Sequence, residues 1–428
     1  MTMVPNFPLP GADPLLVPAL GPDAARPLRF SGDSSRFLSL LIRGACLELV
    51  TFGFYRFWLA TDMRRHLWAA TSVGGDAAEY TGRARELLAG FLLALAIVGP
   101  LAVVNFLLGI YAENLQAFAS APLALFYFAF TQFAMYRARR YRLTRTVWRG
   151  VRFWMTGSGW RYAWKSFWWA VLAAVTLGLA WPWRVAALER YKMANTFYGD
   201  LPGSFTGTGG ALFKRVWWIW LTAIVAVFLV VAIAAAVLGA RAHGSANEAK
   251  FAVAAATGFG LLALVLVALV AYPLLRASEW RWWASGIRFG GVSFASSVRR
   301  RAVIWLYAKT ILLSAVVVSA IATLIVAALW VAVVVFHLKG GNFANFDLAK
   351  GFQLNSLAAM LAFVTAYLVL ALAALAVQRL FLQHELWRLI IDSLMVSGLS
   401  AADDVSARGA AASAVGEGLV DGLDVAGF

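Results

Sequence analysis

Long apolar runs constrain this chain more than any other feature of its sequence. A helix that crosses a lipid bilayer needs about 20 mostly apolar residues, and five runs reach that length. A sixth run is shorter but almost purely apolar and aromatic, and it can begin a turn earlier at Phe118. The six runs are Leu87 to Leu108, Pro122 to Tyr136, Val216 to Ala240, Phe251 to Leu275, Ile311 to Phe336 and Leu357 to Leu380.

The composition supports a membrane protein. Of the 428 residues, 62% are hydrophobic and 14% are charged, whereas a soluble protein has about 45–50% and about 25%. The chain has 37 Lys and Arg against 21 Asp and Glu, which gives a formal net charge of +16. In a membrane protein such an excess reports on topology and on contact with lipid headgroups. Binding to nucleic acid is a distant second interpretation.

Two further apolar runs contain charged residues. The run from Phe37 to Trp58 contains Arg43 and Glu48, and the run from Trp160 to Trp183 contains Lys165. A charge at the centre of a bilayer costs roughly 2.5–3.5 kcal/mol on insertion scales, so a full crossing by these runs is unfavourable. We expect both to be re-entrant or interfacial, with breaks at Thr51-Phe52-Gly53 and Thr176-Leu177-Gly178.

The arginine-rich loops decide between two topologies. Four basic hairpins follow apolar runs, and short loops rich in Lys and Arg stay in the cytoplasm. If both weak runs crossed the membrane, one of these hairpins would lie outside. We therefore predict an all-α, polytopic membrane protein with six full transmembrane helices, two re-entrant or interfacial segments and both termini in the cytoplasm; eight transmembrane helices are the alternative. The hairpins are Arg56 to Glu86, Arg137 to Arg161, Arg184 to Arg215 and Arg276 to Arg301.

The sequence also repeats itself. Residues 30–82 align on residues 155–207 at a constant offset of 125, which places Gly53 on Gly178 and Thr81-Gly82 on Thr206-Gly207. Fainter copies lie between these two and after Tyr272. The repeats predict a polar N-terminal tail at 1–29, a first membrane repeat at 30–154, a second at 155–293, a degenerate third unit at 294–399 and a cytoplasmic tail at 400–428.

Several of these motifs resemble the YjgN-like family of bacterial inner-membrane proteins. They are Thr51-Phe52-Gly53, Tyr80-Thr81-Gly82, Thr176-Leu177-Gly178, Glu189-Arg190-Tyr191 and Phe205-Thr206-Gly207. The resemblance runs from about Leu28 to Phe428 and is weak from Ala302 to Leu382; Arg56-Phe57 stands where the family pattern has a proline. It implies an inner-membrane location and a fold, but no reaction, because the family has no established activity.

Catalytic chemistry has little support in the sequence. No nucleophile motif accompanies a usable histidine, and no phosphate-binding loop is present. One cysteine, Cys46, and four histidines provide no disulfide and no spacing that suits a metal site. His66 is interpreted as an interface residue, with a proton relay as the alternative, and His384 precedes Glu385. We expect no enzyme, no metal and no cofactor.

Two sets of charged residues remain as candidate sites. Glu48 and Arg43 are ionisable groups within a membrane run and are functional candidates for that reason. A purely structural pairing of Glu48 with Arg43 or with a hairpin arginine is the alternative. Six hairpin arginines are candidates for binding an anionic ligand or lipid phosphate, or are interface anchors: Arg64, Arg65, Arg139, Arg140, Arg190 and Arg281.

Together these features predict a transporter, channel or lipid-handling protein for an anionic or amphiphilic ligand. The alternative is a non-transporting membrane scaffold that binds lipid headgroups or partner proteins through its arginine-aromatic hairpins. Membrane lipids are the expected partners in both cases, with no nucleic acid. The ligand, the energy coupling and the oligomeric state are left open by the sequence.

Overall fold

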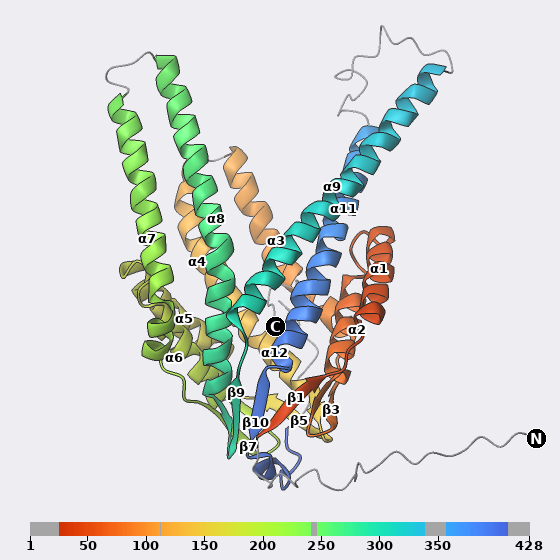
Figure 1. Ribbon diagram of the computed structural model, residues 1–428, viewed down its shortest axis with the longest axis vertical. Coiled ribbons are helices and arrows are strands. Elements are labelled where there is room, and N and C mark those ends of the chain that lie inside the picture. Colours follow the sequence, from red (N-terminus) through yellow and green to blue (C-terminus); the bar gives the residue numbers. More distant parts are fainter. Residues whose placement is uncertain (1–24, 112, 241–245, 339–356, 410–428) are drawn as a thin grey trace, which may run out of the picture.

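The base of the molecule is a closed antiparallel barrel of short strands (Figure 1). The computed structural model describes residues 25–111, 113–240, 246–338 and 357–409. Around the barrel the order is β1-β10-β9-β8-β7-β6-β5-β4-β3-β2. The strands are β1 (Arg26–Phe30), β2 (Thr71–Val73), β3 (Asp76–Tyr80), β4 (Thr146–Trp148), β5 (Val151–Met155), β6 (Thr196–Tyr198), β7 (Leu201–Phe205), β8 (Ile287–Phe289), β9 (Val292–Ser296) and β10 (Leu394–Ser397).

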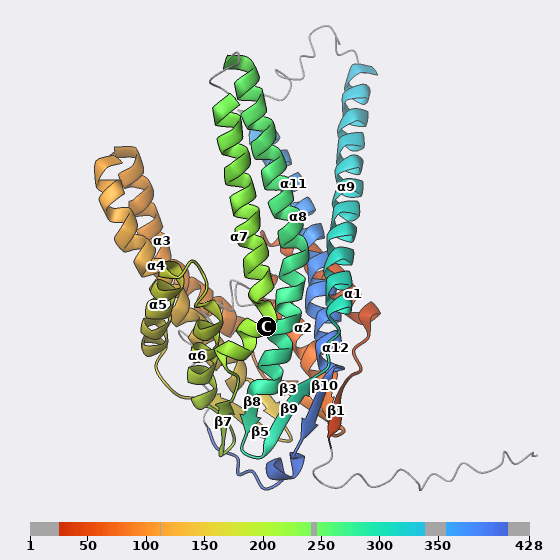
Figure 2. The same ribbon diagram turned by 60° about the vertical axis from the view of Figure 1, so that its left-hand side comes forward.

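Helices connect the strands in pairs, so that a strand–helix–helix–strand order recurs five times along the described chain. All the pairs leave the same end of the barrel, and the long ones diverge from it (Figures 1 and 2). The helices are α1 (Ser34–Val50), α2 (Arg56–Ala69), α3 (Ala84–Tyr111), α4 (Glu113–Thr144), α5 (Gly159–Val175), α6 (Trp181–Ala194), α7 (Gly209–Ala240), α8 (Ala246–Gly286), α9 (Arg300–Leu338), α11 (Leu357–Gln378), the π-helix η2 (Arg379–Glu385), α12 (Leu386–Ile391) and the 3₁₀ helix η3 (Leu399–Ala402).

Two-residue turns join the strands at the far end of the barrel. Gly74 and Gly75 have φ of 63° and 101°, and Arg149 and Gly150 have φ of 49° and 74°. Positive φ at both central residues is the pattern of the type I′ turn, whose twist matches that of the flanking strands. The fifth pair, β10 with β1, has no such turn, because it joins the two ends of the chain and closes the barrel.

The aromatic-Thr-Gly motif marks the places where β3 and β7 leave the barrel. An ideal Cβ on Gly82 would lie 2.5 Å from the Tyr80 ring, and one on Gly207 would lie 2.6 Å from the Phe205 ring. Glycine is therefore needed because the aromatic side chain folds over it.

A backbone hydrogen bond also recurs where the chain leaves the barrel. The Ser or Thr that follows the strand donates its backbone N–H to the carbonyl that precedes the neighbouring strand, in Ser31 to Ala70, Thr81 to Arg145, Thr156 to Asn195, Thr206 to Gly286 and Ser297 to Ser393. The same hydrogen bond thus recurs five times around the barrel. That the repeats of the chain descend from a duplicated unit stays a proposal.

Side chains fill the barrel. Leu28, Trp148, Tyr198, Val292 and Val396 are buried together inside it. Leu399 and Ala402 of η3 pack against the same cluster and cover the turn end of the barrel. The inside of the barrel is therefore a packed hydrophobic core.

The two weak apolar runs fold as short helical hairpins. Thr51 follows α1 and accepts a hydrogen bond from the Tyr55 N–H, after which α2 returns toward the barrel. Phe52 has φ of 50° and Gly53 has φ of 87°; the equivalent Leu177 and Gly178 have φ of 48° and 85°. The predicted positions of the two breaks are confirmed.

The predicted fold class is wrong in two respects. The chain is not all-α, because ten strands form a barrel, and neither six nor eight transmembrane helices are found. Among the described residues three helices are long and apolar enough to cross a membrane. They are Ala84–Tyr111, Arg300–Ala328 and Phe363–Ile391.

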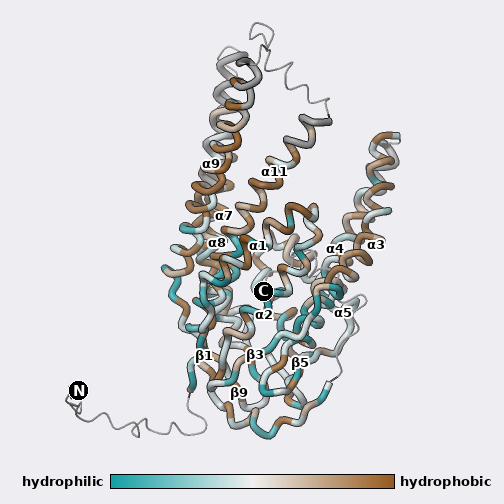
Figure 3. The backbone as a smooth tube through the Cα atoms, turned by 90° about the vertical axis from the view of Figure 1, so that its right-hand side faces the viewer, coloured by the Kyte–Doolittle hydropathy of each residue, from teal (hydrophilic) through white to brown (hydrophobic). Residues whose placement is uncertain are grey.

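The physical reasons for these errors differ. Strands of three to five residues are too short to show a period of two in the sequence, so the barrel was not predicted. The run from Pro122 to Tyr136 lies in α4, where basic residues from Arg137 onward shorten the apolar part. The runs from Val216 to Ala240 and from Phe251 to Leu275 lie in α7 and α8. Neither helix contains a described stretch that is long and apolar enough to count as a membrane span. Hydrophobic residues gather on the helices away from the barrel (Figure 3).

The barrel also includes residues that the sequence placed in the tails. Arg26–Phe30, at the end of the predicted N-terminal tail, form β1. In the predicted C-terminal tail, Asp403 pairs with Arg149 at 2.6 Å and the Ser406 hydroxyl donates to Asp200 at 2.7 Å. The predicted domain boundaries stay a prediction.

Candidate functional site

Two of the candidate arginines have equivalent structural roles. Arg65 donates from Nη2 to the Gly82 carbonyl at 3.0 Å, and Arg281 donates from Nε to the Val298 carbonyl at 2.5 Å. In both cases the acceptor lies 17 residues further along the chain, where the next helix is about to begin. Each guanidinium therefore fixes the exit of a β-hairpin. Arg64 is buried beside the Tyr80 ring.

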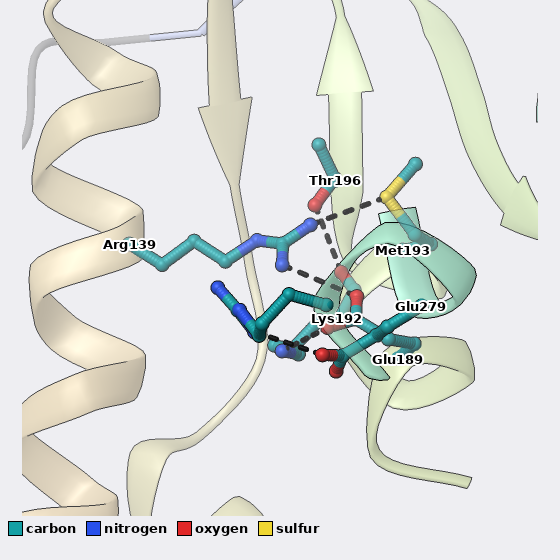
Figure 4. A network of polar contacts seen from close by, with 7 residues as sticks. Arg139, Glu189, Lys192, Met193, Thr196 and Glu279 are labelled. Carbon is teal, nitrogen blue, oxygen red and sulfur yellow. Dashed lines mark hydrogen bonds and ion pairs between the residues drawn. The ribbon is translucent and has the colours of Figure 1, made fainter. Parts of the chain in front are cut away.

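A third candidate belongs to a buried network that joins three helices (Figure 4). We call Arg139, Glu189, Lys192, Arg276 and Glu279 the ion network. Arg139 of α4 lies 3.2 Å from Glu189 of α6, which also pairs with Lys192. In α8, Arg276 lies 2.8 Å from Glu279, whose charge also acts on Lys192. The network therefore connects α4, α6 and α8 near the barrel.

The ion network pairs three cations with two acids. Burial raises the pKa of Glu189, but Lys192 and Arg139 together outweigh it and lower the pKa to about 2. Burial lowers the pKa of Lys192, and Glu189 opposes that shift. Because each buried charge meets an opposite charge, we assign the network a structural role. Arg190 is exposed and Arg140 is half-buried, so the structure does not bring the six arginines to one site.

Glu48 has a different partner from those predicted. Its side chain is 3% exposed, and Oε1 accepts a hydrogen bond from Arg379 at 3.1 Å. Arg43 is exposed on α1. The sequence signal for the pair of Glu48 with Arg379 is that Arg379 is the single arginine in the apolar run from Leu357 to Leu380.

Arg379 begins the π-helix η2, and η2 contacts α1 at both of its ends. At its first residue Arg379 binds Glu48, and at its last residue Glu385 accepts a hydrogen bond from the Ser34 hydroxyl at 2.9 Å. A π-helical turn widens the backbone, and such turns are frequent at functional sites. We call this contact between η2, α1 and α2 the seam.

Two histidines lie in the seam. His384 of η2 is fully buried, and its ring centroid lies 6.0 Å from that of His66 of α2. The Phe37 ring contacts both imidazoles, at 4.8 Å from His384 and 5.4 Å from His66. His384 Nδ1 lies 3.1 Å from Glu385 Oε1, whereas Nε2 of each histidine is buried with no hydrogen-bond partner among the described residues. The sequence analysis gave neither residue this role.

A groove passes beside the seam, between α1, α9, η2 and α12. It consists of two adjoining hollows of about 490 and 500 Å³ that share Ala302, Glu385 and Leu389. One hollow is mainly apolar and is lined by side chains that include Leu38, Trp305, Leu306, Leu380 and Phe381. The other, nearer the barrel, has a larger polar share and is lined by side chains that include Ser297, Arg299, Arg388, Asp392 and Ser393. We call this the amphipathic groove.

The groove holds cations that no acid balances. Glu385 accepts from Ser34, and Asp392 accepts from the Phe30 N–H at 3.0 Å while facing Arg388 at 3.7 Å, so both acids have partners within the fold. Arg299 and Lys309 are exposed and make no ion pair among the described residues; Lys309 Nζ lies 5.0 Å from the Phe381 ring centroid. Lys309 lines the apolar hollow and Arg299 lines the hollow nearer the barrel, so cations and apolar side chains are present together in one groove.

Comparison with known proteins places the chain in a family without assigning an activity. No curated protein and no solved structure matches the chain. A model of a bacterial protein family of unknown function, DUF898, matches residues 25–422. This match covers nearly the whole chain, and the protein therefore belongs to the DUF898 family of bacterial proteins of unknown function.

Proposed function

We propose that the protein is a lipid-handling membrane protein that binds an anionic amphiphile in the amphipathic groove. The observation that carries this proposal is the placement of Arg299 and Lys309, two cations without an acidic partner, in a groove whose other wall is apolar. A phosphate in a lipid headgroup suits the cations. An acyl chain suits the wall that contains Leu38, Leu306 and Leu380.

The position of the groove along α9 supports a ligand that comes from the membrane. Arg300–Ala328 is one of the three candidate membrane spans, and its first turns line the groove. Basic residues gather at the cytoplasmic end of a span, and tryptophan prefers the headgroup region. Arg300 and Arg301 begin α9, and Trp305 is 70% exposed one turn later. The groove would then lie at headgroup depth.

Binding is favoured over conduction or catalysis. Each hollow has a volume within the range of about 300–1,000 Å³ that is usual for ligand sites. The packed core of the barrel supports binding beside the barrel rather than passage along its axis. We propose no catalytic residue.

The cellular setting is part of the proposal. We propose a YjgN-like, multi-pass protein of the bacterial inner membrane, with the barrel and both termini in the cytoplasm. The high net positive charge supports this orientation, as do the basic residues at the barrel end of α9. Strands β1 and β10, which lie near the two ends of the described chain, are neighbours in the barrel, so these ends share one side.

Binding of a lysolipid to the purified protein tests the proposal. Lysophosphatidylglycerol carries a phosphodiester charge and one acyl chain, and lysophosphatidylcholine is its zwitterionic counterpart. We expect Arg299→Gln and Lys309→Gln each to weaken binding of the anionic lysolipid about fivefold, which corresponds to about 1 kcal/mol. The matched control is Arg301→Gln, because Arg301 is exposed on the same turn but does not line the groove.

The outcomes separate the two functions predicted from the sequence. Loss of affinity in the two groove variants, but not in Arg301→Gln, would support a lipid-handling role. Equal effects of all three substitutions would mean that net charge, not the groove, attracts the lipid. Failure of the folded protein to bind either lysolipid would overturn the proposal and favour the scaffold.

A further inference from the structure

We propose that His66 and His384 form a proton-responsive pair that sets the affinity of the amphipathic groove for an anionic amphiphile. The two imidazoles are neutral at pH 7, and uptake of one proton places a positive charge behind Glu385 in the groove. This inference rests on the proposed function, because the coupling requires a ligand in the groove. It adds a regulatory device to that site.

The hydrogen bonds of the pair favour the neutral state. Because Glu385 is the acceptor beside His384 Nδ1, this nitrogen carries the proton and Nε2 keeps a bare lone pair. Nε2 of each histidine is buried and has no partner among the described residues. A proton added to either Nε2 would be a buried charged donor without an acceptor, which is costly in an apolar setting. Phe30 and Phe37 supply that setting against His384.

Charges of both signs surround the pair, and Lys309 of α9, whose Nζ lies 5.0 Å from the Phe381 ring centroid, adds a cation that opposes its protonation. From the start of α1, Asp33 favours a proton on the pair and Arg36, which lies 4.0 Å from Asp33, opposes it. From η2 and α12, Glu385 contacts His384, Arg388 faces Asp392, and Arg379 is paired with Glu48. On α2 the nearest charges, Asp62 and Arg65, pair with each other.

Burial and mutual repulsion decide the charge of the pair. Burial lowers the pKa of His66, and the charge of a protonated His384 would lower it further. Two protons would place two cations 6.0 Å apart between ring centroids, in a site that has one carboxylate in direct contact. The pair therefore takes up a single proton, and it does so at a pH below the ordinary pKa of histidine.

Glu385 couples the pair to the ligand. Its side chain lines both hollows of the groove, and its carboxylate contacts His384. A proton on His384 turns this contact into an ion pair and offsets the negative charge of Glu385. The groove then attracts an anion more strongly. By reciprocity, a bound anion raises the proton affinity of the pair by the same free energy.

A proton explains the pair better than a metal ion does. Among the described residues no group of three or more His, Cys, Asp or Glu side chains could hold a metal. Two imidazoles without a third protein ligand make a poor site for zinc, which takes three or four.

The test is the pH dependence of lysolipid binding between pH 8 and pH 5.5. Lysophosphatidylglycerol suits it because a phosphodiester does not titrate in this range. We expect the wild-type protein to bind this lysolipid about fivefold more tightly at pH 5.5 than at pH 8, and binding of lysophosphatidylcholine to change less than twofold. The His384→Gln variant keeps an amide N–H toward Glu385 but cannot be protonated, and its affinity should not change with pH.

A matched control is His337→Gln, because residue 337 lies roughly 40 Å along α9 from Lys309. This variant should keep the wild-type pH dependence. A pH-independent wild-type affinity, or an unchanged pH dependence in folded His384→Gln, would overturn the inference and leave the proposed function intact. Absence of binding at every pH would overturn the proposed function and the coupling with it.

A measurement without ligand tests the pair itself, which matters if a variant folds poorly. The chain has four histidines, so their imidazole NMR signals can be followed individually. In His384→Gln, the midpoint of the His66 titration should rise toward the ordinary histidine value, because the neighbouring charge has been removed. An unchanged midpoint would show that the two rings do not titrate as a pair and would overturn the inference.

Discussion

The ion network and the seam each hold buried nitrogen without a hydrogen-bond partner among the described residues, Arg276 Nε in the first and Nε2 of two histidines in the second, but only the seam lies beside a groove. In the ion network Glu189 meets both Arg139 and Lys192, and Arg276 meets Glu279. In the seam two imidazole nitrogens are buried without a partner among the described residues, and a groove with unbalanced cations lies beside them. Burial of a charge alone therefore does not identify a functional site. Incomplete pairing beside a hollow is the better indicator.

The largest expected effect breaks the ion network. Glu189→Gln leaves Arg139 and Lys192 without their shared acid, and loss of one partner from a buried pair costs about 3–5 kcal/mol. Denaturant unfolding in detergent should show this loss of stability. The control is Asp62→Asn, in an exposed pair with Arg65, which should change stability by less than about 0.5 kcal/mol. Equal effects of the two substitutions would contradict the structural role of the network.

The pH dependence of stability also tests the structural role of the ion network. Since the folded-state pKa of Glu189 is lowered from 4.5 to about 2, its stabilising contribution is complete above pH 4.5 and is lost as the pH falls toward 2. The wild-type protein should therefore lose more stability over this range than Glu189→Gln does. Parallel curves for the two proteins would show that Glu189 is not held in its charged form.

A smaller effect tests the barrel exit. Gly82→Ala would place a methyl group 2.5 Å from the Tyr80 ring, and overpacking of this kind costs about 1–3 kcal/mol. Gly210→Ala is the matched control, because no atom lies within 4 Å of the added Cβ. Thermal unfolding should show a lower midpoint for Gly82→Ala alone. An unchanged midpoint would contradict the role assigned to the aromatic-Thr-Gly motif.

Two tryptophans carry the same bond between neighbouring units and should have equal, modest effects. The Trp68 indole N–H donates to the Thr146 hydroxyl at 3.0 Å, and the Trp387 indole N–H donates to the Thr71 hydroxyl at 2.9 Å. We expect Trp68→Phe and Trp387→Phe each to cost about 1 kcal/mol of unfolding free energy. A much larger loss for Trp387→Phe would show that the closure between the chain ends is the weak point of the ring.

The smallest expected effect on stability comes from the groove. Lys309→Gln removes an exposed cation that makes no ion pair among the described residues, so stability should change by less than about 0.5 kcal/mol. The fivefold loss of affinity for lysophosphatidylglycerol should nevertheless remain. Unfolding and binding measured on one preparation check both values. If Lys309→Gln lost stability and affinity together, Lys309 would have a structural role, as Glu189 does.

The sequence predicted features that depend on neighbouring residues. The breaks at Thr51-Phe52-Gly53 and Thr176-Leu177-Gly178 are local, since a glycine follows a residue in the left-handed conformation. The barrel was missed because its strands have only three to five residues. Its closure was also beyond local reasoning, since β1 and β10 come from opposite ends of the chain.

The candidate site was missed for a related reason. Glu48 was singled out correctly as a buried acid, but its partner Arg379 is 331 residues away. His66 and His384 are brought together only when η2 packs against α2. Three of the predicted arginines, Arg65, Arg139 and Arg281, proved to bind protein groups, because a guanidinium near a chain turn serves carbonyls and carboxylates as well as phosphate.

Photocrosslinking with a phosphatidylglycerol that carries a diazirine in its acyl chain tests the central claim most directly. The account predicts that the label attaches to residues 302–309 of α9 and to α1 near Leu38, and that excess lysophosphatidylglycerol removes it. Labelling spread evenly over the exposed apolar helices, or unaffected by the competitor, would contradict a specific amphiphile site in the groove.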